Sequence, residues 1–161
     1  MTDAADLTAD LTADLTALTR AVPFARTLNI TILDVRRDAD GSLHAVAELP
    51  DAEAVHNHVG GPHAGAQFSL GETASGAIVM AAFGDQLSRA VPLTVRADIA
   101  YRKLAIGSVR ATARLSRPAT AVIAELDAGI RPEFAVHVEI TTLDGTPTAQ
   151  MTVVWTLRPH R

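Results

Sequence analysis

A polar, glycine-rich loop in residues 57–63 runs into an apolar segment that contains a single carboxylate. The apolar segment, Ala64–Phe83, predicts a helix, and Glu72 lies about two and a half turns inside it, on the order of 12 Å from its start. A helix this apolar normally belongs to a core, where an acid must be compensated. Loop, helix N-terminus and Glu72 together predict a site that binds an anion or a developing oxyanion beside a carboxylate.

The composition of the chain narrows the classes of protein to which it can belong. With 161 residues, 48% of them hydrophobic, the chain predicts one globular domain with a sizeable core. A net charge of −4 gives no reason to expect a nucleic acid or an anionic membrane as partner. The absence of cysteine excludes disulfides, thiolate metal sites and a cysteine nucleophile, and it fits a reducing cytoplasm. The sequence has no secretory signal and no apolar run of about 18 residues, so we expect a cytoplasmic protein without a membrane span.

The first residues of the chain repeat Asp-Leu-Thr-Ala three times within residues 6–17. The repeat places leucines at helical spacing on one face, at Leu7, Leu11, Leu15 and Leu18. We expect residues 1–21 to form a poorly ordered helical extension, with a lid or partner-binding helix as the alternative. Residues 22–161 are then the main domain.

Segments that alternate apolar and polar residues, as strands do, lie on both sides of the expected helix. Turn signals at Asp38–Gly41 and at Asp144-Gly145 predict a hairpin before the helix and another at the end of the chain, and Gly84 is expected to cap the helix. The expected strands cover residues 28–35, 42–49, 93–102, 108–116, 121–127, 134–143 and 148–157, with the weakest pattern in 121–127. This order predicts an α+β fold in which an antiparallel sheet wraps around one long helix.

The predicted order of elements resembles the hot-dog fold, and the loop and helix carry a motif of one of its families. The motif is Asn57-x-x-Gly60-x-x-His63-Ala64-Gly65, followed by Leu70-x-Glu72-x-Ala74. It resembles the Asn-x-x-Gly-x-x-His-Gly-Gly…Leu-x-Asp-x-Ala signature of the phenylacetate-type acyl-CoA thioesterases. Residues 23–30 and 95–107 resemble the segments that flank this motif, so that the resemblance covers residues 22–158. The nearest subgroup is the hot-dog set labelled a domain of unknown function, which carries His-Ala-Gly and Glu at these positions.

The resemblance implies hydrolysis of an acyl-CoA, or of a related acyl thioester, to the free acid and the thiol. Glu72 takes the place of the acid that acts as nucleophile or as general base on water, and Asn57 that of the residue that positions the water or the thioester. The backbone N–H of Ala64, with that of Gly65, takes the oxyanion-hole position. Thr94 takes the place of a hydroxyl that the opposite subunit contributes. An acid and an oxyanion hole suffice for this chemistry, so neither a metal nor a cofactor is required.

Each of these residues also has a structural explanation. Glu72 could be a buried acid that is paired structurally, and Asn57 could cap a turn. His63 is expected to hydrogen-bond the loop, with a role as catalytic base as the alternative. Thr94 lies on a predicted strand, where threonine is common. Some relatives have a hydroxyl one turn after the acid, whereas this chain has Gly76, which favours Thr94 as the helper.

The acyl-CoA itself has further candidate contacts. Arg96, Arg102 and Lys103, together with Arg89, flank the strand next to the helix and could hold the phosphates of CoA, or could form an ordinary solvated face. The chain has few aromatic residues, which favours an aliphatic or small acyl group over a large aromatic one.

Two other functions compete with hydrolysis. Three histidines crowd into the loop at positions 56, 58 and 63, but nothing close to them except Glu72 supplies a further ligand, so we expect no metal site. A hot-dog protein could instead bind acyl-CoA or a fatty acid without hydrolysing it. The fold implies a homodimer with two equivalent sites, and dimers of dimers are common in the family.

Overall fold

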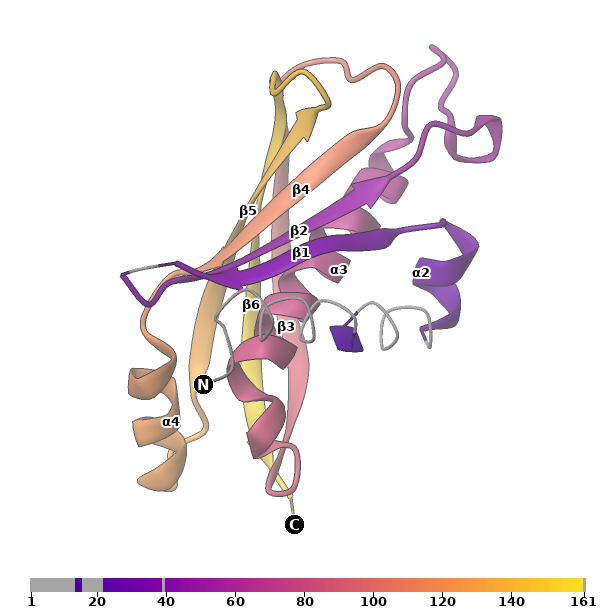
Figure 1. Ribbon diagram of the computed structural model, residues 1–161. Coiled ribbons are helices and arrows are strands. Elements are labelled where there is room, and N and C mark those ends of the chain that lie inside the picture. The colour runs from indigo at the N-terminus through magenta and orange to yellow at the C-terminus, as the bar shows by residue number, and fades with distance from the viewer. Residues whose placement is uncertain (1–13, 16–21, 39, 161) are drawn as a thin grey trace.

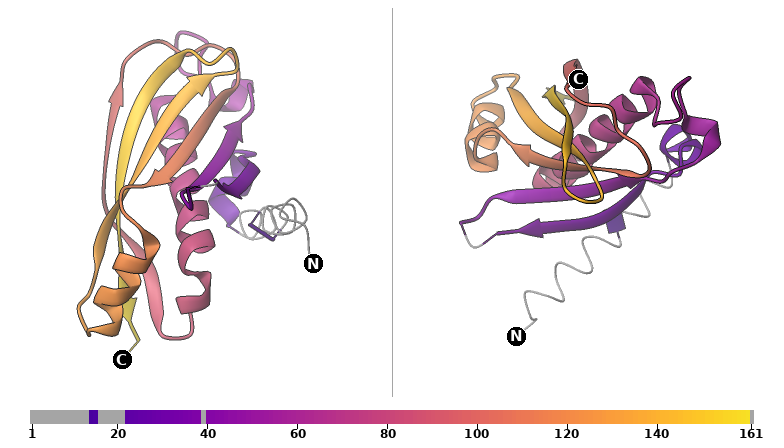
Figure 2. Two further views of the ribbon diagram at one scale, coloured as in Figure 1. Left: turned by 60° about the vertical axis from the view of Figure 1, so that its left-hand side comes forward. Right: turned by 90° about the horizontal axis from the view of Figure 1, so that it is seen from above.

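The computed structural model describes residues 14–15, 22–38 and 40–160 of the chain. These form one antiparallel sheet with the strand order β1-β2-β4-β5-β6-β3, and the long helix α3 lies lengthwise against its inner side (Figures 1 and 2). The strands are β1 (Thr31–Arg37), β2 (Leu43–Leu49), β3 (Ala90–Tyr101), β4 (Val109–Leu115), β5 (Glu133–Thr142) and β6 (Pro147–Pro159). The helical elements are α2 (Pro23–Thr27), η1 (Glu53–Val55), α3 (Ala64–Phe83), η2 (Gly84–Gln86) and α4 (Ala119–Asp127).

The helix α3 has the bounds that the sequence predicts, Ala64 to Phe83. It contains no proline and is rich in alanine, so the backbone meets no helix breaker over its 20 residues. Apolar side chains lie on all sides of it, and the curved sheet covers it with the inner residues of every strand. Gly84 is the C-cap, as expected, but it stays in right-handed helical geometry and leads into the short 3-10 turn η2.

The two expected hairpins are present, β1 with β2 and β5 with β6, and the meander β4-β5-β6 follows the predicted order. Gly41 and Gly145 have positive φ values in these turns, as such turns require. The expected α+β architecture, an antiparallel sheet around one helix, is therefore confirmed. No helix in the described part of the chain has the length and apolar character needed to cross a membrane.

The strand expected over residues 121–127 is wrong, because this segment belongs to the helix α4. Two β-branched residues, Val122 and Ile123, gave it a strand-like appearance. The residues that α4 buries are Val122 and Leu126, four positions apart, which is the spacing of one helical face. Arg117 donates two hydrogen bonds to the carboxylate of Glu125 and so ties the helix to the end of β4.

The edge strand β3 contains an irregularity that matters for the site. Thr94 pairs with Trp155 and Arg96 with Val154, so Val95 is an extra residue, a β-bulge. Because the bulge shifts the alternation by one, Thr94 faces α3 with Trp155, while Arg96 lies on the outer face with Val154. Beyond β3 the sheet has no further strand within the described residues.

Candidate functional site

The N-terminus of α3 begins with a histidine cap. His63 has extended backbone angles (φ −58°, ψ 143°), and its ring Nδ1 accepts a hydrogen bond from the N–H of Gly65 at 2.9 Å. This contact satisfies one of the N–H groups that a helix start leaves without an acceptor. The ring of His63 therefore caps the helix and occupies the N–H of Gly65.

Ala64, by contrast, offers a backbone N–H that hydrogen-bonds to none of the residues the structure describes. It is the first N–H of α3, at the positive end of the helix dipole, and Ala64 is a solvent-exposed residue. The hydroxyl of Tyr101, at the end of β3, donates to the carbonyl of Ala64 at 2.7 Å and anchors this first turn to the sheet. Of the two expected oxyanion donors, Ala64 is therefore available and Gly65 is not.

The loop before the helix is organised by Asn57. Its Oδ1 accepts hydrogen bonds from the N–H groups of Val59 and Gly61, while its Nδ2 bonds to none of the described residues. Gly61 lies directly on the backbone of Ala105, since a Cβ at this position would come 2.2 Å from the carbonyl oxygen of Ala105. Asn57 therefore holds the loop together through its oxygen and keeps its amide nitrogen for another partner.

A hollow of about 400 Å³ lies at this end of the helix. We call it the N-terminal hollow; its lining includes Asn57, Ala64, Gln67, Tyr101, Arg102 and Lys103. Arg102 and Lys103 thus lie at the start of the helix, where they and the helix dipole would attract an anion.

The other expected phosphate-binding residues lie elsewhere. The bulge places Arg96 on the outer face of the sheet, away from α3. Arg89 is engaged with the side chains of Asp127 (2.6 Å) and Gln86 (2.7 Å). The structure brings Arg102 and Lys103 together and separates Arg96 and Arg89 from them.

Glu72 is half-buried in the middle of α3. Burial raises the pKa of its carboxyl group above the usual value for glutamate, and the side chain of Thr94 offsets part of this rise. We expected the Thr94 of an opposite subunit to reach this acid. The structure instead places Thr94 of the same chain beside Glu72, because Thr94 faces α3 as the neighbour of Trp155.

A chain of buried hydrogen bonds fixes the helix turn that carries Glu72. The indole Nε1 of Trp155 donates to the Ser75 hydroxyl at 3.0 Å, and this hydroxyl donates to the backbone carbonyl of Glu72 at 2.7 Å. Neither Trp155 nor Tyr101 had an assigned role at the sequence level. They are the only Trp and the only Tyr of the chain, and this was the one feature of the sequence that could have singled them out.

A second hollow, of about 330 Å³, opens beside Glu72. We call it the Glu72 hollow; its lining includes Leu15, Val22, Gly76, Met80 and Trp155. It shares no lining residue with the N-terminal hollow.

Ala64 and Glu72 of one chain cannot act on the same small group. Eight residues of helix separate them by about 12 Å along the axis. An oxygen bound to the Ala64 N–H lies about 3 Å beyond the helix start, so the total is about 15 Å. The side chain of Glu72 and one bridging water span less than this distance. One chain therefore presents the N–H of Ala64 and the carboxylate of Glu72 as two separate groups.

The loop histidines do not converge. His56 pairs with Asp51 (Nε2 to Oδ1, 2.6 Å), and His63 caps α3. Within the residues that the structure describes, no group of three or more histidine, aspartate or glutamate side chains has an arrangement that could hold a metal ion.

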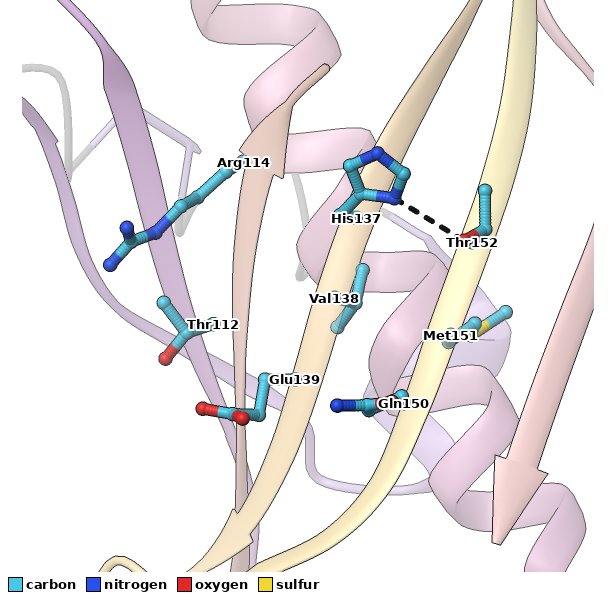
Figure 3. Close-up of a pocket in the computed structure, with 8 residues that line it drawn as sticks. All are labelled: Thr112, Arg114, His137, Val138, Glu139, Gln150, Met151 and Thr152. Carbon is cyan, nitrogen blue, oxygen red and sulfur yellow. Dashed lines mark hydrogen bonds between the residues drawn. The ribbon is translucent and has the colours of Figure 1, made fainter.

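A third hollow, of about 560 Å³, lies on the outer face of the sheet. Figure 3 shows Arg114, His137 and Glu139 projecting there from β4 and β5, and a hydrogen bond of 3.3 Å between His137 and Thr152. This outer hollow is on the side of the sheet away from α3. It has no helix N-terminus to bind an oxyanion, so we do not place the candidate site there.

Comparison with known proteins gives a family and a fold. The family described as "Domain of unknown function (DUF4442)" matches residues 13–157. A Pseudomonas aeruginosa protein of unknown function, described as a probable thioesterase, superposes with a TM-score of 0.80 at 23% identity over 92% of this chain and 96% of its own. A thioesterase family protein from Silicibacter pomeroyi gives a TM-score of 0.70 at 19% identity over 92% of this chain and 98% of its own. A search of curated proteins finds no sequence match. At these identities the superpositions show the fold, which is the expected hot-dog fold.

Proposed function

Because the chain belongs to the DUF4442 family, whose description names no activity, we propose its function from the site: hydrolysis of an acyl thioester, such as an acyl-CoA, to the free acid and the thiol. One observation carries this proposal. The same helix presents an unoccupied N–H at its start and a half-buried carboxylate of raised pKa in its middle. The thioesterase descriptions of the similar structures support it.

The two groups have complementary tasks in this reaction. The thioester oxygen accepts a hydrogen bond from the N–H of Ala64, which stabilises the negative charge as the tetrahedral intermediate forms. The carboxylate of Glu72 takes a proton from the attacking water, so that a C–O bond forms at the carbonyl carbon. When the intermediate collapses, the C–S bond breaks and the thiolate leaves with the electron pair. The proton held by Glu72 then restores the thiol.

We propose that the complete site forms between two subunits, with Ala64 from one and Glu72 from the other. The edge strand β3 exposes apolar side chains at Val91, Leu93 and Val95, which are 39%, 39% and 44% accessible. A long apolar edge is the kind of strand that pairs with another chain. Thr94 near Glu72 lies in the middle of β3, and Tyr101 at Ala64 lies at its end. Antiparallel pairing of two β3 strands centred near Asp98 therefore places Thr94 of one chain opposite Tyr101 of the other and brings the two halves together.

The N-terminal hollow would receive the CoA end of the substrate. Arg102 and Lys103 lie there beside Ala64 and supply two positive charges for phosphate groups. Asn57 lines the same hollow, and its Nδ2, which bonds to none of the described residues, can donate to the thioester or to the water. A cytoplasmic location, where acyl-CoA thioesters are made and used, fits the absence of cysteine.

Non-catalytic binding of an acyl-CoA or a fatty acid is the second candidate, favoured by the apolar lining of the Glu72 hollow. Release of free thiol from a panel of acyl-CoAs, acetyl to palmitoyl with phenylacetyl and benzoyl, separates the two functions. Hydrolysis predicts turnover of at least one member. A folded dimer that binds fatty acids and turns over none of them would leave binding as the function.

The rate of thiol release should depend on pH through Glu72. Only the ionised carboxylate accepts a proton from water, and burial raises the pKa of Glu72 above 4.5. The value of kcat/KM should therefore fall as the pH drops, with an acid limb centred above pH 4.5. In Glu72→Gln, the residual kcat/KM measured over the same pH range should no longer show this acid limb. An acid limb that is unchanged in Glu72→Gln would contradict the assignment.

A further inference from the structure

The Glu72 hollow is built from parts of the chain that are far apart in sequence. Gly76 and Met80 of α3 form one side, and Trp155 of β6 lies beside them. Residues ahead of the first strand, Leu15, Val22 and Ala25, complete the lining. Leu15 and Ala25 are buried, with 6% and 3% of their surface accessible. The segment ahead of β1 therefore contributes to the hollow directly beside the candidate catalytic acid.

Resting on the proposed thioesterase function, we propose that this hollow holds the aliphatic acyl chain of the substrate, and that Leu15 and Gly76 set the longest chain accepted. The residues that line the hollow indicate which kind of acyl group it can hold. Among the described residues around the hollow, Glu72 is the one charged side chain, and none is cationic. A charged or strongly polar acyl group would lose its hydration there without gaining a partner. Met80 is flexible and adapts to an alkyl chain.

Gly76 leaves room that a larger residue would take. A Cβ built on Gly76 would lie 3.8 Å from the indole ring of Trp155, which is an ordinary contact. The helix therefore has room for a Cβ at this position, beside Trp155 in the lining of the hollow. Leucine at this position should occupy the room of about four methylene groups of an acyl chain. Leu15 lines the same hollow, and shortening it to alanine should enlarge the hollow.

The hollow is small, at the lower end of the range of about 300–1,000 Å³ for ligand pockets. Affinity for a saturated fatty acid should rise about fourfold with each added methylene until the hollow is full, and then stop rising. The chain length at which this rise stops measures the length of the hollow.

The experiment measures that length in full-length dimers by two independent methods. The first is the dissociation constant of straight-chain fatty acids from butanoate to tetradecanoate, by calorimetry, which needs no hydrolysis. The second is kcat/KM for the matching acyl-CoAs. The variants are Gly76→Leu, the milder Gly76→Ala, and Leu15→Ala. Gly84→Leu and Leu33→Ala are matched controls, because neither position lines the hollow, a Cβ at Gly84 meets open space, and Leu33 is exposed.

In Gly76→Leu, the affinity for fatty acids should stop increasing at a chain length about four carbons shorter than in the wild type, while short chains still bind. Gly76→Ala should shorten this limiting chain length by less. Leu15→Ala should move it to longer chains, and both controls should match the wild type. These shifts in fatty-acid binding without turnover of any acyl-CoA would support the hollow and refute the thioesterase function. Turnover whose chain-length profile and fatty-acid affinities are the same in all variants would overturn the hollow and leave the thioesterase function intact.

Discussion

Replacing Glu72 by glutamine should lower kcat for thioester hydrolysis at least about 100-fold, equivalent to about 2.7 kcal/mol of lost transition-state stabilisation. The amide keeps the size of the side chain but cannot take a proton from the attacking water. The measurement is thiol release under saturating acyl-CoA, with KM determined in parallel. KM should change little, because the residues expected to hold CoA, Arg102 and Lys103, line the N-terminal hollow, and Glu72 does not.

The same substitution carries an internal check on folding. Since burial raises the pKa of Glu72, the native state favours its protonated form, and ionisation at neutral pH costs stability. Glu72→Gln should therefore be at least as stable as the wild type at pH 7, measured by thermal unfolding. Glu139→Gln, an exposed carboxylate in the outer hollow, is the matched control and should keep full activity. Loss of activity in Glu139→Gln with none in Glu72→Gln would move the site to the outer face.

Replacing Ala64 by proline should lower kcat about 10²- to 10³-fold, the usual cost of losing one oxyanion donor. Proline is suited to the first position of a helix, where it removes an N–H that has no partner within the helix. His63 before it already has extended angles, as a residue before proline requires. The carbonyl that accepts from Tyr101 is retained. The substitution thus removes the backbone N–H donor at position 64 and leaves the helix start in place.

Ala64→Gly is the control for this prediction, because it keeps the N–H and should retain most of the activity. Circular dichroism and thermal unfolding of both variants show whether the helix start is preserved. A folded Ala64→Pro protein with wild-type kcat would remove Ala64 from the reaction.

Local patterns in the sequence are enough to predict much of this fold. The long apolar run between a glycine-rich loop and Gly84 predicts α3 to the residue. The segment at 121–127 fails for a local reason, because a short run with Val122 and Ile123 fits a strand and a helix, and packing of Val122 and Leu126 decides between them. The face on which Thr94 lies could not be predicted, since alternation gives no sign of the bulge at Val95.

In the candidate site, too, some residues can be predicted from the sequence and some contacts cannot. Glu72, Ala64 and His63 can be named from one continuous motif, and the helix fixes their spacing. The hydrogen bonds from Tyr101 to Ala64 and from Trp155 to Ser75 join residues 37 and 80 positions apart, and no local pattern announces them. The same holds for Gly65, whose N–H is lost to the His63 ring through the rotamer of one side chain.

The central claim, a site made of Ala64 from one subunit and Glu72 from the other, is tested most directly by mixed dimers. Ala64→Pro and Glu72→Gln chains carrying different tags are co-expressed, and the heterodimer is purified through both tags. In the heterodimer one site has lost both groups and the other has both intact, so its activity should return to about half that of the wild-type dimer, far above either parent. A purified heterodimer as inactive as its two parents would contradict the account.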